Sequence, residues 1–127
     1  MNVVDSSAWL AWFTDEAGAE PFAPVIEDTD SLVVPAICLH EVFRFVLRNR
    51  GEDAALEAAS LMQRGVVVDL DASLAMESAQ VGLTEGLATA DAIIYATTLE
   101  VEGTLWTRDA RFAGKPHVRF FPKDTVP

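Results

Sequence analysis

The alternation of short apolar segments with longer helix-like segments restricts the fold of this chain most strongly. Five segments have the composition of strands: Asn2 to Asp5, Ser31 to Val34, Val66 to Leu70, Thr104 to Thr107 and Val118 to Phe121. Strands that alternate with helices pair in parallel and carry helices on both faces of the sheet. Continuous apolar strands such as Val66-Val67-Val68 fit a sheet that is buried on both sides. The sequence therefore predicts an α/β fold.

Capping residues and glycines set the expected limits of the helices. The predicted helices run from Ser6 or Ser7 to about Phe13, from Pro35 to Gly51, from Asp53 to Arg64, from Ala72 to Glu85, and from a Thr89 cap to about Glu102. Serine and threonine suit helix starts, and glycine suits helix ends. The acidic segment 15–30, interrupted by glycine and prolines, is expected to be a loop with a short helix.

Length and composition point to one intracellular domain. The chain has 127 residues, half of them hydrophobic, which predicts a single domain over residues 1–127 with a packed core. One cysteine, Cys38, rules out an internal disulfide, and a zinc site would need more Cys and His. No signal peptide or membrane-length apolar run is evident, so we expect a cytoplasmic protein without a membrane partner.

The charge is unevenly distributed. The net charge of −11 would repel polyphosphate over long distances. However, the nine basic residues are clustered: three lie between residues 44 and 50, and five lie between residues 108 and 123. The second stretch is either an ordinary solvated surface or a surface that contacts phosphate, and bound metal ions would also reverse the local sign.

Four carboxylates lie where acidic residues are not expected in a packed fold. They are Asp5, Glu41, Asp91 and Asp109. Asp5 and Asp109 each follow a predicted strand, so they fall at the carboxyl edge of the sheet, where ligands of open α/β folds bind. Glu41 interrupts an apolar helical segment, and Asp91 begins another.

Each carboxylate also has a structural interpretation. Asp5 could cap the next helix, and Asp91 could favour a helix start through the helix dipole. Glu41 could pair with Arg44 one turn later. Asp109 could shape a turn through an Asx-type hydrogen bond.

Together the four acids suit metal-dependent phosphate chemistry. Carboxylates that fold into one place must repel, be protonated or share cations. Mg²⁺ and Mn²⁺ prefer such oxygen ligands, and they activate phosphate esters toward hydrolysis. Thr107 would add a hydroxyl beside Asp109, although a β-branched residue in a strand is also common. Arg108 and Arg111 are predicted to contact substrate phosphate.

Four segments in register resemble the PIN-domain nucleases, and in particular the VapC toxins of toxin–antitoxin pairs. The matching segments are Val3-Val4-Asp5-Ser6-Ser7-Ala8, Pro35-Ala36-Ile37-Cys38-Leu39-His40-Glu41-Val42, Ala90-Asp91-Ala92-Ile93-Ile94-Tyr95-Ala96 and Thr107-Arg108-Asp109-Ala110-Arg111-Phe112. Each segment alone is a weak signal, but their order and spacing extend over nearly the whole chain.

The resemblance implies a three-layer α/β/α sandwich around a mainly parallel sheet. It implies one acidic pocket in which Asp5 and Asp91 bind Mg²⁺ or Mn²⁺ directly and Glu41 and Asp109 complete the site. The family cleaves RNA, so the resemblance implies an endoribonuclease that acts as the toxin of a toxin–antitoxin pair. A cognate antitoxin and a homodimer are the implied protein partners.

One departure and three alternatives accompany this interpretation. Some relatives carry a further acid shortly after the position of Asp109. Its absence from Ala110 to Lys115 predicts that a second metal binds weakly or needs substrate to bind. Asp69-Leu70-Asp71 resembles the motif of haloacid-dehalogenase-type phosphatases, but too few residues follow it for that fold. A response-regulator receiver would need a pair of acids where Asp5 stands alone. The non-enzymatic alternative is a catalytically inert PIN-like domain that binds other proteins.

Overall fold

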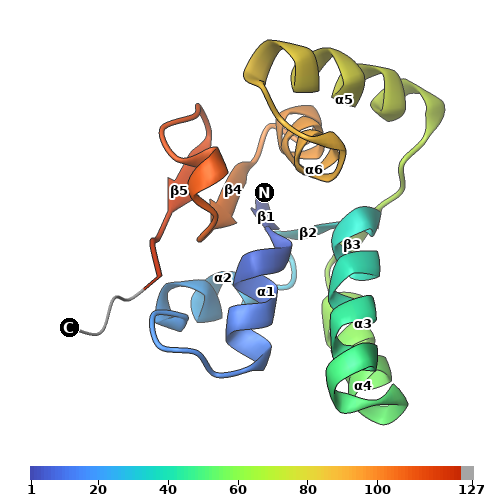
Figure 1. The fold of residues 1–127 in the computed structure, drawn as a ribbon, viewed down its shortest axis with the longest axis vertical. Helices are drawn as coiled ribbons and strands as arrows, with labels where there is room; N and C mark the ends of the chain where they lie inside the picture. The colour runs from blue at the N-terminus through green and yellow to red at the C-terminus, as the bar shows by residue number, and fades with distance from the viewer. Residues whose placement is uncertain (124–127) are drawn as a thin grey trace.

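A five-stranded parallel sheet forms the centre of the molecule. The computed structural model describes residues 1–123. The strands are β1 (Asn2–Val4), β2 (Leu32–Pro35), β3 (Val66–Val68), β4 (Thr104–Thr107) and β5 (Val118–Phe120). Their order is β3-β2-β1-β4-β5, and every neighbouring pair is parallel. β1 and β4 are thus adjacent at the centre of the sheet, although about 100 residues separate them along the chain (Figure 1).

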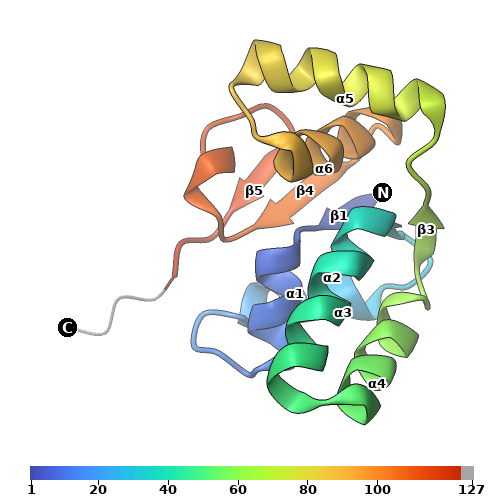
Figure 2. The ribbon, with the colours of Figure 1, turned by 45° about the vertical axis from the view of Figure 1, so that its right-hand side comes forward.

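Helices cover both faces of this sheet. They are α1 (Ser6–Phe13), α2 (Ala23–Glu27), α3 (Ala36–Arg50), α4 (Glu52–Met62), α5 (Ala72–Glu85) and α6 (Thr89–Glu100), with the short 3₁₀ turns η1 (Glu20–Phe22) and η2 (Ala110–Phe112). In Figure 2, α5 and α6 lie above the sheet and α1 to α4 lie below it. The predicted three-layer α/β/α arrangement is confirmed.

Local sequence signals account for most of the element ends. Gly86 ends α5 in the left-handed conformation, with φ of 68°, which costs glycine little because it has no Cβ. Pro35 precedes α3, and Gly51 follows its last residue. Thr89 is the first residue of α6 and not its cap, since the N-cap position belongs to Ala88.

The prediction of a sheet buried on both sides is wrong for one strand. β3 lies at the edge of the sheet, and Val66 is 55% exposed. Its apolar composition did not distinguish an edge strand from a central one, because strand order depends on pairing and not on local sequence. The inner strands do match the expectation, since Val3, Val4, Val33 and Val34 are buried.

The strand order also determines where a site can form. From β1 the chain builds β2 and β3 on one side of this strand, whereas β4 and β5 are added on its other side. The order in which strands are added to the sheet therefore reverses between β1 and β4. Open parallel sheets bind ligands at such a position, beyond the carboxyl ends of the strands. No helix within residues 1–123 is long and apolar enough to cross a membrane.

Candidate active site

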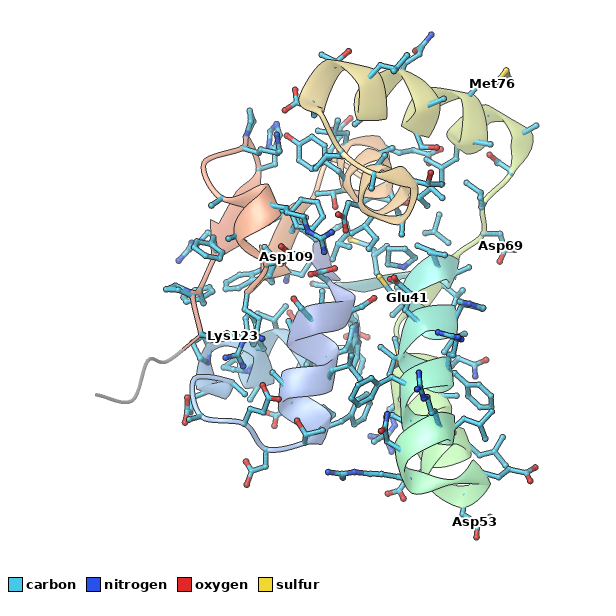
Figure 3. All side chains as sticks on the ribbon, viewed as in Figure 1. Glu41, Asp53, Asp69, Met76, Asp109 and Lys123 are labelled. Atoms are coloured by element: carbon cyan, nitrogen blue, oxygen red, sulfur yellow. The ribbon has the colours of Figure 1, made fainter. Side chains whose placement is uncertain are left out.

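The four predicted acids come from four different elements around this position. Asp5 follows β1, and Asp109 follows β4 by two residues. Glu41 lies on α3, and Asp91 lies in the first turn of α6. In Figure 3, Asp109 and Glu41 lie on either side of the start of α1. The fold thus brings together acids separated by up to 104 positions in the sequence.

Asp5 is held by two hydroxyl groups. It is 4% exposed, and its Oδ2 accepts hydrogen bonds from Ser7 Oγ at 2.6 Å and from Thr107 Oγ1 at 2.8 Å. Although Asp5 occupies the N-cap position of α1, its side chain makes no capping hydrogen bond. The capping interpretation of Asp5 is therefore wrong. Both donors approach Oδ2. No donor within residues 1–123 forms a hydrogen bond to the other oxygen, Oδ1.

Thr107 links two of the acidic residues. Its Oγ1 accepts a hydrogen bond from the backbone N–H of Asp109 at 2.9 Å while its hydroxyl proton is directed to Asp5. The Thr107 side chain is fully buried, so water does not compete for these bonds. Thr107 therefore fixes the relative placement of Asp5 and of the chain segment that carries Asp109.

Glu41 is positioned by the start of α1. Its Oε1 accepts a hydrogen bond from Ser6 Oγ at 2.8 Å. The alternative pairing with Arg44 is absent from the ion pairs of residues 1–123. Ser6 and Ser7 thus direct their hydroxyls to different acids, Glu41 and Asp5 respectively.

Arg111 bridges the other two acids. Its Nη1 lies 3.2 Å from Asp91 Oδ2, and its Nη2 lies 2.6 Å from Asp109 Oδ2. Asp109 Oδ1 also accepts the backbone N–H of Arg111, so the predicted Asx-type bond is present. The contact between Arg111 and Asp91 is an ion pair and not a hydrogen bond. Asp91 Oδ2 is therefore buried without a hydrogen-bond partner. Asp109 is therefore well satisfied, whereas Asp91 is only partly compensated.

The pKa values of the acids reflect these surroundings. Burial raises the pKa of Asp5; the hydrogen bonds from Ser7 and Thr107 oppose this shift, and repulsion by Asp109 and Asp91 adds to it. Burial also raises the pKa of Asp91, against the effect of Arg111, and repulsion by Asp109 and Glu41 adds to the rise. Hydrogen bonds from Arg111 lower the pKa of Asp109. The acids thus form one electrostatically coupled group.

Arg108 does not lie with this group. It is 6% exposed, and its Nη1 pairs with Glu16 at 3.3 Å. Its Nη2 donates to the carbonyl of Ala17 at 3.4 Å. This arrangement ties the end of β4 to the loop after α1. A direct contact between Arg108 and substrate phosphate stays a prediction, and such a contact would require this buried side chain to move.

The donor set fits a hard divalent cation. Within residues 1–123, no three His, Cys, Asp or Glu side chains form a ready-made metal-binding group. The guanidinium of Arg111 lies against Asp91 and Asp109, where a bound cation would also neutralise charge. Asp5 Oδ1 and the buried Asp91 Oδ2 nevertheless lack hydrogen-bond donors. Carboxylate oxygens of this kind are the ligands that Mg²⁺ and Mn²⁺ prefer.

Sequence reasoning did not assign the two serines to the site. The sequence predicts Ser6 or Ser7 as a helix cap, whereas their hydroxyls bond Glu41 and Asp5. Their position directly after Asp5 was an available signal, because consecutive residues at a helix start point in different directions. The distant partners Glu41 and Thr107 could not be read from that spacing.

A protein-family model described as PIN domain matches residues 3–117. This range includes the four acids and all of their hydrogen-bonding partners described above. No protein of curated function shows significant sequence similarity to the chain.

Solved structures share the fold over nearly the full length of the chain. A toxin–antitoxin complex from Klebsiella pneumoniae has a chain with 20% identity and a TM-score of 0.82, over 98% of this chain and 100% of that chain. VapC20 of Mycobacterium tuberculosis, described as a Sarcin-Ricin loop cleaving toxin, has 19% identity and a TM-score of 0.78, over 96% and 100%. The DNA-bound VapBC of Salmonella typhimurium has 16% identity and a TM-score of 0.72, over 95% and 96%.

Proposed function

The chain belongs to the PIN domain family, and from this membership we propose that it is a divalent-metal-dependent endoribonuclease. The observation that carries the proposal is the environment of Asp5. This carboxylate is buried, is held on one oxygen by Ser7 and Thr107, and is coupled to Asp91 and Asp109. A buried anion held this rigidly is costly unless a cation compensates it.

The residues have distinct roles in this proposal. Asp5 and Asp91 would hold Mg²⁺ or Mn²⁺, with Glu41 and Asp109 completing the acidic pocket. When bound, the ion would polarise the scissile phosphate, lower the pKa of the attacking water and stabilise the leaving oxygen. Ser7 and Thr107 orient Asp5 by their hydrogen bonds to Oδ2.

Ser6 and Arg111 act on the remaining acids. Ser6 holds Glu41 on the α1 side of the pocket. Arg111 holds Asp109 through its hydrogen bonds, and 67% of its side chain is exposed. That exposed guanidinium supports the predicted contact with substrate phosphate, since arginine binds phosphate oxygens through two donors at once.

We also propose that the nuclease is the toxin of a toxin–antitoxin pair. Three of the structural neighbours are described as toxin–antitoxin or VapBC complexes, from Klebsiella pneumoniae, Rickettsia felis and Salmonella typhimurium. An antitoxin would inhibit the enzyme by covering the acidic pocket. A homodimer is the second proposed assembly, and the exposed apolar side chains of α5 support it, as argued below.

The competing proposal is an inert PIN-like domain that binds other proteins. The ion pairs of Arg111 favour it, because they already neutralise part of the charge on Asp91 and Asp109. The two proposals differ in metal binding. A nuclease needs Mn²⁺ or Mg²⁺ bound through the acids, whereas an interaction domain does not.

Cleavage of end-labelled total RNA by the antitoxin-free protein tests the proposed function. Lanes with Mg²⁺, Mn²⁺ and EDTA would be compared, with Asp91→Asn as the matched control that keeps the size of the side chain. We expect discrete fragments that depend on metal and are absent with the variant. Folded wild-type protein that neither cleaves RNA nor binds Mn²⁺ would instead support the inert domain.

A further inference from the structure

Two hollows lie beside acids of the candidate site, one on each side of the start of α1 (Figure 3). The first, which we call the α3 hollow, has a volume of about 480 Å³ and contains Ser6, Glu41 and Phe45 in its lining. The second, which we call the β5 hollow, has a volume of about 460 Å³ and contains Ser7 and Asp109. The consecutive residues Ser6 and Ser7 therefore line different hollows, and each hollow contains one of the four acids.

The α3 hollow combines an aromatic ring with free positive charge. Phe45 is 44% exposed, although a phenylalanine in a core would be buried. Arg44 and Arg48 line the same hollow, and neither has an ion-pair partner within residues 1–123. Phe45 and Arg48 follow Glu41 at helical spacing, so they extend the face of α3 that carries this acid.

The β5 hollow repeats this combination with unrelated elements. Phe120, from β5, and Lys123 line it together with Asp109. Lys123 and Asp109 line the same hollow, so a cationic side chain lies on the same side of the site as this acid. In Figure 3, Lys123 lies on the same side of α1 as Asp109, and Glu41 lies on the opposite side.

We propose that the two hollows bind single-stranded RNA on either side of the bond to be cleaved. In each hollow a base stacks on the phenylalanine, and a flanking phosphate contacts the basic side chains. This inference rests on the proposed function and adds the path of the substrate. Aromatic stacking combined with cationic contacts to phosphate is how proteins bind unpaired nucleic acid.

The distribution of charge favours RNA over a peptide as the ligand. The chain has a net charge of −11 and nine basic residues, so an anionic ligand needs local positive charge. Arg44 and Arg48 supply it in one hollow and Lys123 in the other, and Arg111 lies against Asp91 and Asp109. A strand passing over a metal ion would find basic groups on both sides.

Binding of a fluorescently labelled, unstructured RNA in EDTA tests the path without cleavage. Phe45→Leu and Phe120→Leu keep an apolar side chain but remove the flat ring. We expect each variant to bind about tenfold more weakly, within the range of base stacking on an aromatic side chain. Leu56→Ala, an exposed apolar residue of α4 outside both hollows, is the control that should bind like the wild type.

The dependence of RNA affinity on salt concentration tests the role of the basic residues. We expect Arg48→Gln and Lys123→Gln each to reduce the slope of log K against log salt by about 0.7, the value for one phosphate contact of a single strand. Arg64→Gln, which removes an exposed charge in the turn after α4, should leave the slope unchanged. Unchanged melting temperatures would show that all variants are folded.

The outcomes separate this inference from the proposed function. Wild-type affinity and slope in the hollow variants would overturn the RNA path even if the protein cleaves RNA. An effect confined to one hollow would overturn the two-sided path. Weaker binding to the antitoxin with unchanged RNA binding would assign the surface to a protein partner. RNA binding that depends on both hollows, in a protein that never cleaves, would support the path and contradict the nuclease.

Discussion

Asp5 is the most deeply buried of the four acids, with 4% of its surface exposed. Burial raises its pKa, and the hydroxyls of Ser7 and Thr107 oppose the shift only in part. A carboxyl whose pKa is raised by folding stabilises the fold fully below its unfolded pKa. This contribution is lost as the pH rises through the folded pKa. The raised pKa of Asp5 therefore makes the metal-free protein less stable at neutral pH than it would be without this carboxyl.

Asp5→Asn should consequently stabilise the metal-free protein at neutral pH. The amide removes the buried charge and can still accept hydrogen bonds from Ser7 and Thr107. We expect a gain of about 1 kcal/mol at pH 7, or roughly 4 °C in melting temperature, which disappears near pH 4. Thermal melts in EDTA at both pH values measure this effect. A variant that melts below the wild type at pH 7 would contradict the conclusion that the Asp5 carboxyl destabilises the metal-free protein.

Thr107→Val should weaken the site without changing the shape of the buried side chain. It removes the donor to Asp5 Oδ2 and the acceptor for the Asp109 N–H. We expect a loss of about 1–3 kcal/mol in stability and ~10–100-fold weaker Mn²⁺ binding. Denaturant unfolding and isothermal titration calorimetry measure the two effects, and Thr107→Ser should recover much of the metal affinity.

Thr98→Val provides the matched control for Thr107. Thr98 is equally buried, but its hydroxyl donates to the carbonyl of Ile94 within α6, at 3.0 Å. The Thr98→Val variant should be less stable than the wild type but should bind Mn²⁺ with the same affinity. Equal losses of metal affinity in both variants would mean that Thr107 acts only through general stability.

The pairing of β1 with β4 brings the site together. Its register places Val4 beside Trp106, so Asp5, which follows β1, and Thr107, the last residue of β4, come within hydrogen-bonding distance. Periodicity and glycine stops predicted these two strands separately. Their adjacency could not be predicted locally, because strands so far apart in sequence pair according to the whole topology. The same limit explains the exposed edge strand β3.

Gly103→Ala should disturb this pairing. A Cβ at position 103 would lie 2.7 Å from the carbonyl oxygen of Met1, which accepts the N–H of Thr104. We expect a loss of about 1–3 kcal/mol, because the start of β4 must move relative to β1. Mn²⁺ binding should weaken as well. Denaturant unfolding and titration calorimetry measure the two changes.

Gly86→Ala is the control for a glycine effect that is confined to one helix end. A Cβ there meets no atom within 4 Å, so the cost is only the left-handed backbone, about 1 kcal/mol. Its Mn²⁺ affinity should match that of the wild type. If Gly103→Ala also kept wild-type affinity, the strand register would not control the site.

The molecule as a whole carries charge that limits how copies associate. A net charge of −11 makes two copies repel, so a stable dimer needs a contact surface with little charge. The outer face of α5 offers one, since Met76 and Leu83 are exposed there, Leu83 to 90%. Figure 3 shows Met76 at the outer side of α5, far from Glu41 and Asp109. A second copy bound there would leave the pocket open.

Leu83→Glu should therefore convert the proposed dimer into a monomer. The substitution loses almost no packing within one copy, but it places a charge in the contact surface. Sedimentation equilibrium gives the mass of wild type and variant. Leu56→Glu on α4 is the control that should stay dimeric. A wild type that is monomeric at high concentration, or a dimeric Leu83→Glu, would exclude α5 as the dimer surface.

Local patterns were enough to predict the order of the elements and to single out four acids, which the fold brings into one electrostatically coupled group. Hydrophobic periodicity, helix caps and glycines determine structure over a few residues. For this reason strand β4 and helix α5 have the bounds that the sequence predicts. The partners of each side chain depended on packing. The bond from Thr107 to Asp5 and the bridge of Arg111 from Asp109 to Asp91 join elements that meet only in the folded sheet. Burial of Arg108 has the same origin, because the loop that covers it lies about 90 residues earlier in the chain.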